Sequence, residues 1–340
     1  MSASMTEVDP DLIDMMDAVF AEYREATPSP TGLDSALWQQ LHELGLARLT
    51  GPEVSGGSGA GWYEAAELLT AAARHGVRVP LAEHDLLAGW LLDATGLPSA
   101  GDIRTVCMLD EHATARGVPW AASAARIVVV FEAGGEYRVT DLDAEKLTVT
   151  PGFNAIGEPR DGVTADVSTL DGPSVPATVV TQLRLKAALV RSIQVCAALD
   201  RIVQLSVEHA TSRIQFGRAL SRFQAVQHLI ADLAAEAALA RAATEAALTS
   251  AVSTGWSGEN LEFRVAAARS CAGHAAAVVA RNAHQVHGAI GTTAEHRLHE
   301  FTRAALAWRC EFGSIRYWDQ RVTDAALTAG AAGTWGLITG

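Results

Sequence analysis

The chain has 340 residues, of which 49% are hydrophobic and 19% are charged, and its formal net charge is −13. This length and apolar content suffice for several layers of secondary structure around a sizeable core. The acidic balance argues against a general surface for nucleic acid or an anionic membrane, while leaving room for a local basic pocket that binds a phosphate-bearing ligand. Neither a nucleic acid nor a membrane is therefore expected as a partner.

The cysteines and the start of the chain indicate a reduced, cytoplasmic protein. The four cysteines lie far apart and show neither a CxxC pair nor a Cys/His ligand spacing, so the sequence predicts no disulfide framework and no metal site. Residues 1–10 lack the basic and apolar regions of a signal peptide. No apolar stretch reaches the length of a transmembrane helix without a charge.

The predicted fold class is α+β, mainly α, with three domains. Residues 1–101 are expected to form a helical domain, with helices over residues 11–20, 62–75 and 81–95. A further helix around Leu37 and Leu41 has Asp34 or Ser35 as its candidate N-cap. A glycine-rich loop over residues 51–61 interrupts this domain.

Residues 102–180 are predicted to form a small β domain. The β-branched run at residues 125–131 is followed across a Gly-Gly turn by residues 137–140, a pattern typical of a hairpin. Residues 146–150 and 165–169 are expected to add further short strands.

Residues 181–330 are predicted to form a four-helix bundle. Four alanine-rich helical segments cover residues 184–211, 222–254, 260–287 and 295–327. Because the connections between them are short, successive helices should be antiparallel neighbours.

The first connection of the bundle, residues 213–224, carries residue types suited to an anionic, partly flat ligand. The guanidinium of Arg213 can form paired hydrogen bonds to phosphate oxygens. Phe216 offers an apolar face, Gly217 permits a tight turn, and Gln224 can hydrogen-bond from the start of the next helix. The alternative is an ordinary connection between helices with Phe216 in the core.

A second segment, residues 285–291, ends the third bundle helix with two glycines. Gln285 supplies amide donors and acceptors, Gly288 allows the backbone to approach a ligand, and Gly291 is expected to form a left-handed helix terminus. The alternative is a plain helix end with His284 and His287 exposed to solvent.

The domain order and these two segments resemble the acyl-CoA dehydrogenase family over essentially the whole chain. The resemblance implies an acyl-CoA substrate, FAD as cofactor and an electron-transferring flavoprotein as acceptor. It also implies that Arg213, Phe216, Gln224, Gln285 and Gly288 contact the FAD of a neighbouring subunit. One departure is Ala289, which replaces a glycine that is usual in the family.

The catalytic residue is unknown, because the carboxylate that the family uses as general base is missing from its usual place. That place, just before a Gly-Ser pair in the last helix, is occupied by Phe312. Glu311 lies one residue early, which in a regular helix is about 100° of rotation. It can act as base only if the helix is locally irregular. The family's other position coincides with residues 186–188, which contain no carboxylate. Unrecognised candidates for the base are Glu295, Glu300 and Asp85.

The β domain departs from the family as well. Residues 109–117 lack the Thr-Glu and Gly-Ser pattern that meets the flavin and the acyl-CoA, and the domain is shortened. Together with the missing base, this resembles the shorter, degenerate subunit of actinobacterial α2β2 acyl-CoA dehydrogenases, several of which act in sterol degradation. In that arrangement a longer subunit carries the base. The alternatives are a self-sufficient homotetramer that uses Glu311 as base, and a scaffold without flavin. The acyl group is not specified by the sequence.

Overall fold

A computed structural model describes residues 8–27, 32–99 and 101–339 of the chain. These residues divide into two compact units, with the boundary between Ala187 and Ala188. Most of the N-terminal segment used in the signal-peptide argument lies outside the described residues. Within the described residues, no helix combines the length and the apolar character that crossing a membrane would require.

The first unit begins with the predicted helices. Its elements are α1 (Pro10–Ala26), α2 (Ser35–Glu43), α3 (Trp62–His75), the π-helical turns of η2 (Ala82–Gly89) and α4 (Trp90–Thr95). Asp34 caps α2, because its carboxylate accepts hydrogen bonds from the backbone N–H groups of Ala36 and Leu37. The helix predicted over residues 81–95 is therefore present, but its first half is π-helical.

The β part of the first unit is built from two small sheets. Strands β1 (Arg104–Met108), β3 (Arg126–Ala133), β4 (Glu136–Asp143) and β7 (Ser174–Val175) form one sheet in the order β1-β3-β4-β7. Strands β2 (Thr114–Pro119), β6 (Arg160–Thr164) and β5 (Thr148–Thr150) form the other. The β3–β4 hairpin is the predicted one. Side chains from both sheets, among them Val118, Phe131 and Val163, share one apolar core.

One strand prediction in this region is wrong. Within residues 165–169, Val167–Thr169 forms a 3-10 turn. The carboxylate of Asp166 accepts a hydrogen bond from the backbone N–H of Ser168 at 3.0 Å, which is a local alternative to strand pairing.

Helix α5 (Ala177–Ser212) continues into the second unit, which also contains α6 (Gln224–Ser253), α7 (Leu261–His287), α8 (Leu298–Trp308) and α9 (Ile315–Thr339). Helix α6 packs along α7, and α7 also contacts α8 and α9. The buried side chains of α6 and α7 are largely alanines, for example Ala240 and Ala276, which are fully buried. Small side chains let these helices approach each other closely.

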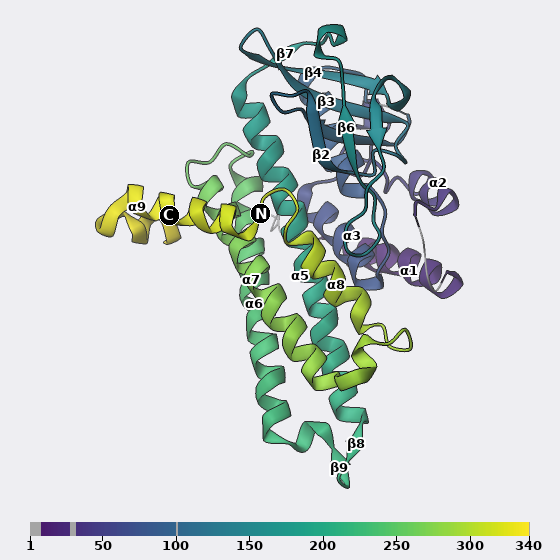
Figure 1. The fold of residues 1–340 in the computed structure, drawn as a ribbon, viewed down its shortest axis with the longest axis vertical. Coiled ribbons are helices and arrows are strands. Elements are labelled where there is room, and N and C mark those ends of the chain that lie inside the picture. The colour runs from purple at the N-terminus through teal and green to yellow at the C-terminus, as the bar shows by residue number, and fades with distance from the viewer. Residues whose placement is uncertain (1–7, 28–31, 100, 340) are drawn as a thin grey trace. The chain divides into compact units, whose positions relative to one another are not determined.

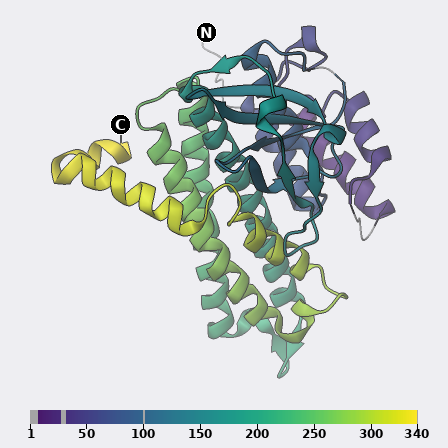
Figure 2. The same cartoon turned by 45° about the horizontal axis from the view of Figure 1, so that its top comes forward.

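The last predicted bundle helix, residues 295–327, is not continuous. It is divided into α8 and α9 by a turn over residues 309–314, visible in Figure 2. Phe312 and Gly313 have φ angles of 52° and 116°, which a right-handed helix cannot accommodate. The turn falls at the position where the sequence places the family's general base.

Candidate functional site

The first predicted cofactor segment is a β-hairpin at the end of the bundle, rather than a plain corner between helices (Figure 1). Arg213 follows the last residue of α5, and strands β8 (Ile214–Gln215) and β9 (Arg218–Ala219) pair in antiparallel fashion. Phe216 and Gly217 form the tip, with φ angles of 51° and 78°. Two successive positive φ angles are typical of the tightest hairpin turns. The backbone N–H of Leu220 closes the hairpin by donating to the carbonyl of Arg213 at 2.9 Å.

The side chains of this hairpin point into solvent. Phe216 is 92% exposed, so the alternative in which it belongs to the core is wrong. Its only ring contact among the described residues is an edge-on one with Phe223, at a centroid distance of 6.2 Å. The guanidinium of Arg218 lies 4.1 Å from the centre of the Phe223 ring. Arg213 and Gln224 are also exposed, and Gln224 is the first residue of α6.

The second predicted segment ends α7. Gln285 is exposed in the last turn, and Gly288 terminates the helix with φ 64° and ψ −146°, a conformation that is nearly restricted to glycine. The expectation that Gly291 forms the left-handed terminus is wrong. Gly291 is buried, and a Cβ atom there would lie 2.9 Å from the side chain of Leu298. His287 is also buried, which contradicts the alternative of a solvated helix end.

The structure brings the two segments to the same end of the bundle. His209, four residues before Arg213, stacks on His287, which directly precedes Gly288, with a distance of 4.5 Å between ring centroids. The five residues predicted to bind the cofactor therefore lie around one exposed end of the second unit.

The position of the expected base is a turn held by two buried arginines. Nε of Arg191 donates to Oε2 of Glu311 at 2.7 Å, and the two side chains are 1% and 14% exposed. The guanidinium of Arg269 donates to the backbone carbonyls of Glu311 and Arg309 at 2.7 and 3.0 Å. Burial lowers the pKa of Arg269 to about 10, which still leaves it charged near neutral pH.

The geometry of this turn bears on both expectations for Glu311. The local irregularity that a Glu311 base requires is present, because residues 309–314 are not helical. However, the Glu311 carboxylate is engaged in an ion pair, and the ring of Phe312 lies 5.0 Å from the guanidinium carbon of Arg191. Sequence reasoning missed Arg191 and Arg269. The only feature of the sequence that could have indicated them is an arginine on an otherwise apolar face of a helix.

Of the other three candidate carboxylates, two form ion pairs within the fold and one is exposed to solvent. Asp85 is buried and pairs with Arg48 at 2.6 Å. Burial raises the pKa of Asp85, and its bonds with Thr50 and Arg48 oppose that rise. Glu300 pairs with Arg297 at 3.3 Å, and Glu295 is exposed.

A buried amine lies within residues 186–188, where the family's other base position is expected. Lys186, in α5, is 1% exposed, and its Nζ lies 4.7 Å from the ring centre of Trp62 and 4.5 Å from that of Trp90. Burial lowers its pKa to about 6, whereas the two indole faces favour the charged form. Residues 186–188 therefore contain a buried amine and no carboxylate that could remove a proton.

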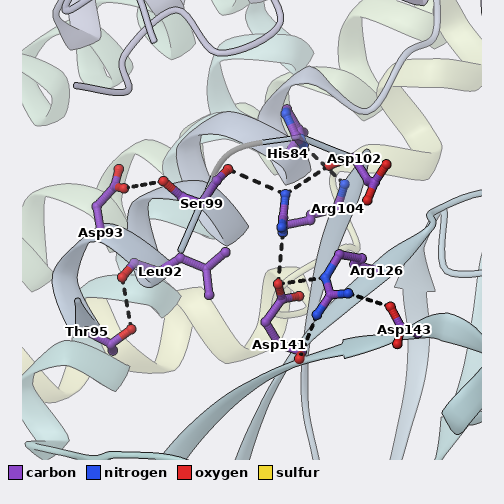
Figure 3. Close-up of polar contacts among 10 residues, drawn as sticks. All are labelled: His84, Leu92, Asp93, Thr95, Ser99, Asp102, Arg104, Arg126, Asp141 and Asp143. Atoms are coloured by element: carbon purple, nitrogen blue, oxygen red, sulfur yellow. Dashed lines mark hydrogen bonds and ion pairs between the residues drawn. The ribbon is translucent and has the colours of Figure 1, made fainter. Parts of the chain in front are cut away.

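The most extensive polar network of the β part, drawn in Figure 3, is internal to the fold. Arg104 and Arg126 share the carboxylate of Asp141, with Nε–Oδ2 distances of 3.2 and 2.8 Å. The backbone N–H of Arg104 donates to Nδ1 of His84, whose pKa burial lowers to about 3. Arg104, Arg126 and Asp141 border a pocket of about 330 Å³. The two arginine charges are balanced by Asp141 and Asp143, so the network stabilises the joint between η2 and the sheet.

Comparisons with known proteins identify the family. Residues 178–318 match the acyl-CoA dehydrogenase C-terminal domain. The acyl-CoA dehydrogenase IpdE2 of Mycobacterium tuberculosis is 31% identical over 298 residues, which span 84% of this chain and 85% of IpdE2. FadE27 of the same organism is 28% identical over 352 residues, covering 90% of this chain and 93% of FadE27.

Solved structures of similar fold include heteromeric enzymes. A chain of the ChsE4–ChsE5 complex of Mycobacterium tuberculosis has a TM-score of 0.80 at 24% identity, covering 95% of this chain and 98% of that one. A chain of the Tcur3481–Tcur3483 steroid acyl-CoA dehydrogenase has a TM-score of 0.81 at 20% identity, with the same coverage.

The chain belongs to the acyl-CoA dehydrogenase family. The predicted family and fold class are confirmed, and the chain is of the oxidoreductase class that acts on acyl-CoA thioesters. Members of this family are FAD-dependent flavoproteins. The three-domain division and the individual site residues stay predictions.

Proposed function

We propose that this chain is a subunit of a heteromeric acyl-CoA dehydrogenase, in which it completes an FAD site seated on a longer partner subunit. The observation that carries the proposal is the contrast between the two ends of its second unit. One end presents an exposed hairpin with an uncovered phenylalanine at its tip. At the other, the place of the general base is occupied by a turn and a buried ion pair.

The hairpin end fits FAD. Arg213 is exposed and has the geometry to bind a pyrophosphate through paired hydrogen bonds. Phe216 is an aromatic side chain 92% exposed in a strained turn, which is expected where another molecule covers it. Next to Gly288 there is open space where a side chain would stand, so a ligand can approach the backbone. Gln224 and Gln285 add amide groups at the same end.

This chain's part in the reaction is to bind and orient. FAD, when bound, accepts the hydride that leaves Cβ of the acyl-CoA as a carboxylate removes a proton from Cα. In this chain Arg213 would neutralise the charge of the FAD pyrophosphate. Phe216 would exclude water from the apolar side of the cofactor. The proton-accepting carboxylate would come from the partner, because Glu311 is paired with Arg191 and residues 186–188 contain no carboxylate.

The substrate class and the assembly are inferred from relatives. The ChsE4–ChsE5 complex and the Tcur3481–Tcur3483 steroid enzyme consist of two different chains. By analogy we propose an α2β2 assembly in the cytoplasm. It would act on a CoA thioester derived from a steroid or another lipid and pass electrons to an electron-transferring flavoprotein.

The proposal is tested by expressing this chain alone and together with longer acyl-CoA dehydrogenase subunits encoded near it. The expected result is a stable complex that contains FAD, whereas the chain alone has little FAD and no turnover. A homo-oligomer of this chain with stoichiometric FAD and full turnover would instead establish the self-sufficient alternative. A native complex without FAD at the Arg213 hairpin would establish the scaffold alternative.

A further inference from the structure

Three histidines from three separate segments converge beneath the hairpin. His209 lies in the last turn of α5, His287 is the last residue of α7, and His296 precedes α8. One nitrogen from each ring can be chosen so that all three lie within 4.8 Å of one another. The His287 ring is 4.5 Å from that of His209 and 4.7 Å from that of His296, measured between centroids. Packing of three imidazoles requires an explanation, because each ring has two polar nitrogens to satisfy.

The hydrogen bonding of His287 leaves one of its two nitrogens without a hydrogen-bond partner among the described residues. Its Nδ1 lies 2.8 Å from the carbonyl oxygen of Ala283, and since a carbonyl can only accept, Nδ1 must carry the proton. In the neutral ring, Nε2 then carries no proton, and its lone pair is available to a ligand. Nε2 is buried without a hydrogen-bond partner among the described residues, and His287 as a whole is only 5% exposed. A backbone carbonyl on one nitrogen with the other nitrogen free is the usual setting of a metal-binding histidine.

We propose that His209, His287 and His296 form a binding site for a divalent transition-metal ion such as Zn²⁺, with its fourth position open to water. Three nitrogens 4.8 Å apart lie on a circle of radius about 2.8 Å, whereas Zn–N bonds are about 2.0–2.1 Å long. Each ring therefore has to move by less than about 1 Å. Imidazole nitrogens suit Zn²⁺, Co²⁺, Ni²⁺ and Cu²⁺, and the set contains no carboxylate cage of the kind that Ca²⁺ or Mg²⁺ needs.

Hydrogen bonds and charges around the three histidines determine what must change when a metal binds. The backbone N–H of Leu298 donates to Nδ1 of His296 at 3.1 Å, so His296 must change tautomer or exchange this bond for the metal. The carboxylate of Glu208 is close enough to His296 to favour a cation there, whereas the guanidinium of Arg213 acts on His209 in the opposite sense. The charge of His284 lowers the pKa of His287, and that of His299 lowers the pKa of His296. Because the charges of Glu208 and Arg213 oppose each other, the site suits a metal that forms strong bonds to nitrogen rather than one held by charge alone.

The position of this site gives it a structural role. A metal bound there would fasten the end of α5, which leads into Arg213, to the end of α7, which leads into Gly288. It would thereby fix the spacing of the two exposed segments. The metal site rests on its own three histidines, and metal binding can be measured whether or not the chain binds FAD.

The test uses the full chain without a histidine tag, stripped with a chelator, and Zn²⁺ or Co²⁺ as the only probe. Calorimetry should give one Zn²⁺ per chain. Co²⁺ should produce the intense visible absorption of a four-coordinate site. His287→Ala should weaken binding at least about 100-fold, since loss of a residue that merely orients a metal ligand costs about 10–100-fold. His274→Gln is the matched control, because that histidine is exposed and pairs with Asp319 elsewhere on the bundle.

If His287→Ala does not fold, the half-buried His209→Gln and His296→Gln variants serve instead, with folding checked by circular dichroism. Each is expected to lose the rise in melting temperature that Zn²⁺ produces in the parent chain. Equal Zn²⁺ affinity in the parent and in both variants, or no binding by the parent, would overturn the proposal.

Discussion

Glu311 is bound to the buried guanidinium of Arg191, with Nε and Oε2 2.7 Å apart. Arg191 lies in α5, and Glu311 lies in the turn that separates α8 from α9. We therefore predict that Glu311→Gln in the assembled enzyme lowers stability by about 3–5 kcal/mol, because it removes the carboxylate that pairs with the buried Arg191 charge. The value of kcat should change less than about threefold. Urea unfolding and steady-state kinetics measure the two effects.

The matched control for Glu311 is Glu295→Gln, which removes an exposed carboxylate and should change neither quantity. Loss of a general base would lower kcat by about 100-fold or more. Such a loss in the Glu311 variant, with the structure intact, would show that Glu311 is the base after all.

The hairpin should matter for cofactor binding and not for the stability of this chain. We predict that Arg213→Gln weakens FAD binding by the complex about 10–100-fold, since a charge-assisted hydrogen bond contributes about 1.5–3 kcal/mol. Phe216→Ala should weaken it as well, while neither variant shifts the melting temperature of the isolated chain, because both side chains are exposed. Flavin release on dilution measures the affinity. Arg241→Gln, on α6 and paired with Asp200, should leave FAD binding unchanged.

Gly288 should tolerate no side chain. At φ 64° and ψ −146° an L-residue is strained by about 1–3 kcal/mol, so Gly288→Ala should destabilise the chain by that amount or shift the end of α7. In either case FAD content of the complex should fall. Gly336→Ala, at an exposed position inside α9, should be neutral or slightly stabilising. Parallel urea denaturation of the two variants gives the comparison, and equal stabilities would contradict the assignment.

Lys186 should give the stability of the chain a dependence on pH. Its pKa falls from 10.5 to about 6 on folding because of burial. The unfolded chain therefore binds more protons between these values, and stability should rise with pH from about 6 to 10. Lys186→Met should raise the free energy of unfolding at pH 7 by about 1–3 kcal/mol and flatten this rise. Denaturation at several pH values measures how the free energy of unfolding depends on pH. Lys146→Met is the control, because it removes an exposed lysine and should leave this dependence unchanged.

Much of the fold could be predicted because local signals agreed with it. The Asp34 cap, the β3–β4 hairpin and the long alanine-rich helices all follow from spacing and turn residues. The break before α9 was missed because Gly313 alone indicates only a weak interruption, and positive φ at Phe312 depends on tertiary contacts with Arg191 and Arg269.

Only part of the candidate site could be predicted from the sequence, for a similar reason. Arg213 and Phe216 stand in a contiguous motif, so the sequence reveals them together. The histidine cluster draws on positions 209, 287 and 296, and such separations carry no recognisable ligand spacing. Likewise, nothing in the residues around Lys186 predicts that Trp62 and Trp90 enclose it.

The central claim is that this chain supplies part of an FAD site and that its partner supplies the base. The most direct test is the amount of FAD and the turnover of the chain alone and of the co-expressed complex. We predict two FAD molecules and full activity for each α2β2 complex, with little FAD and no turnover in the isolated chain. One FAD per chain with full turnover in a homo-oligomer of this chain would contradict the claim.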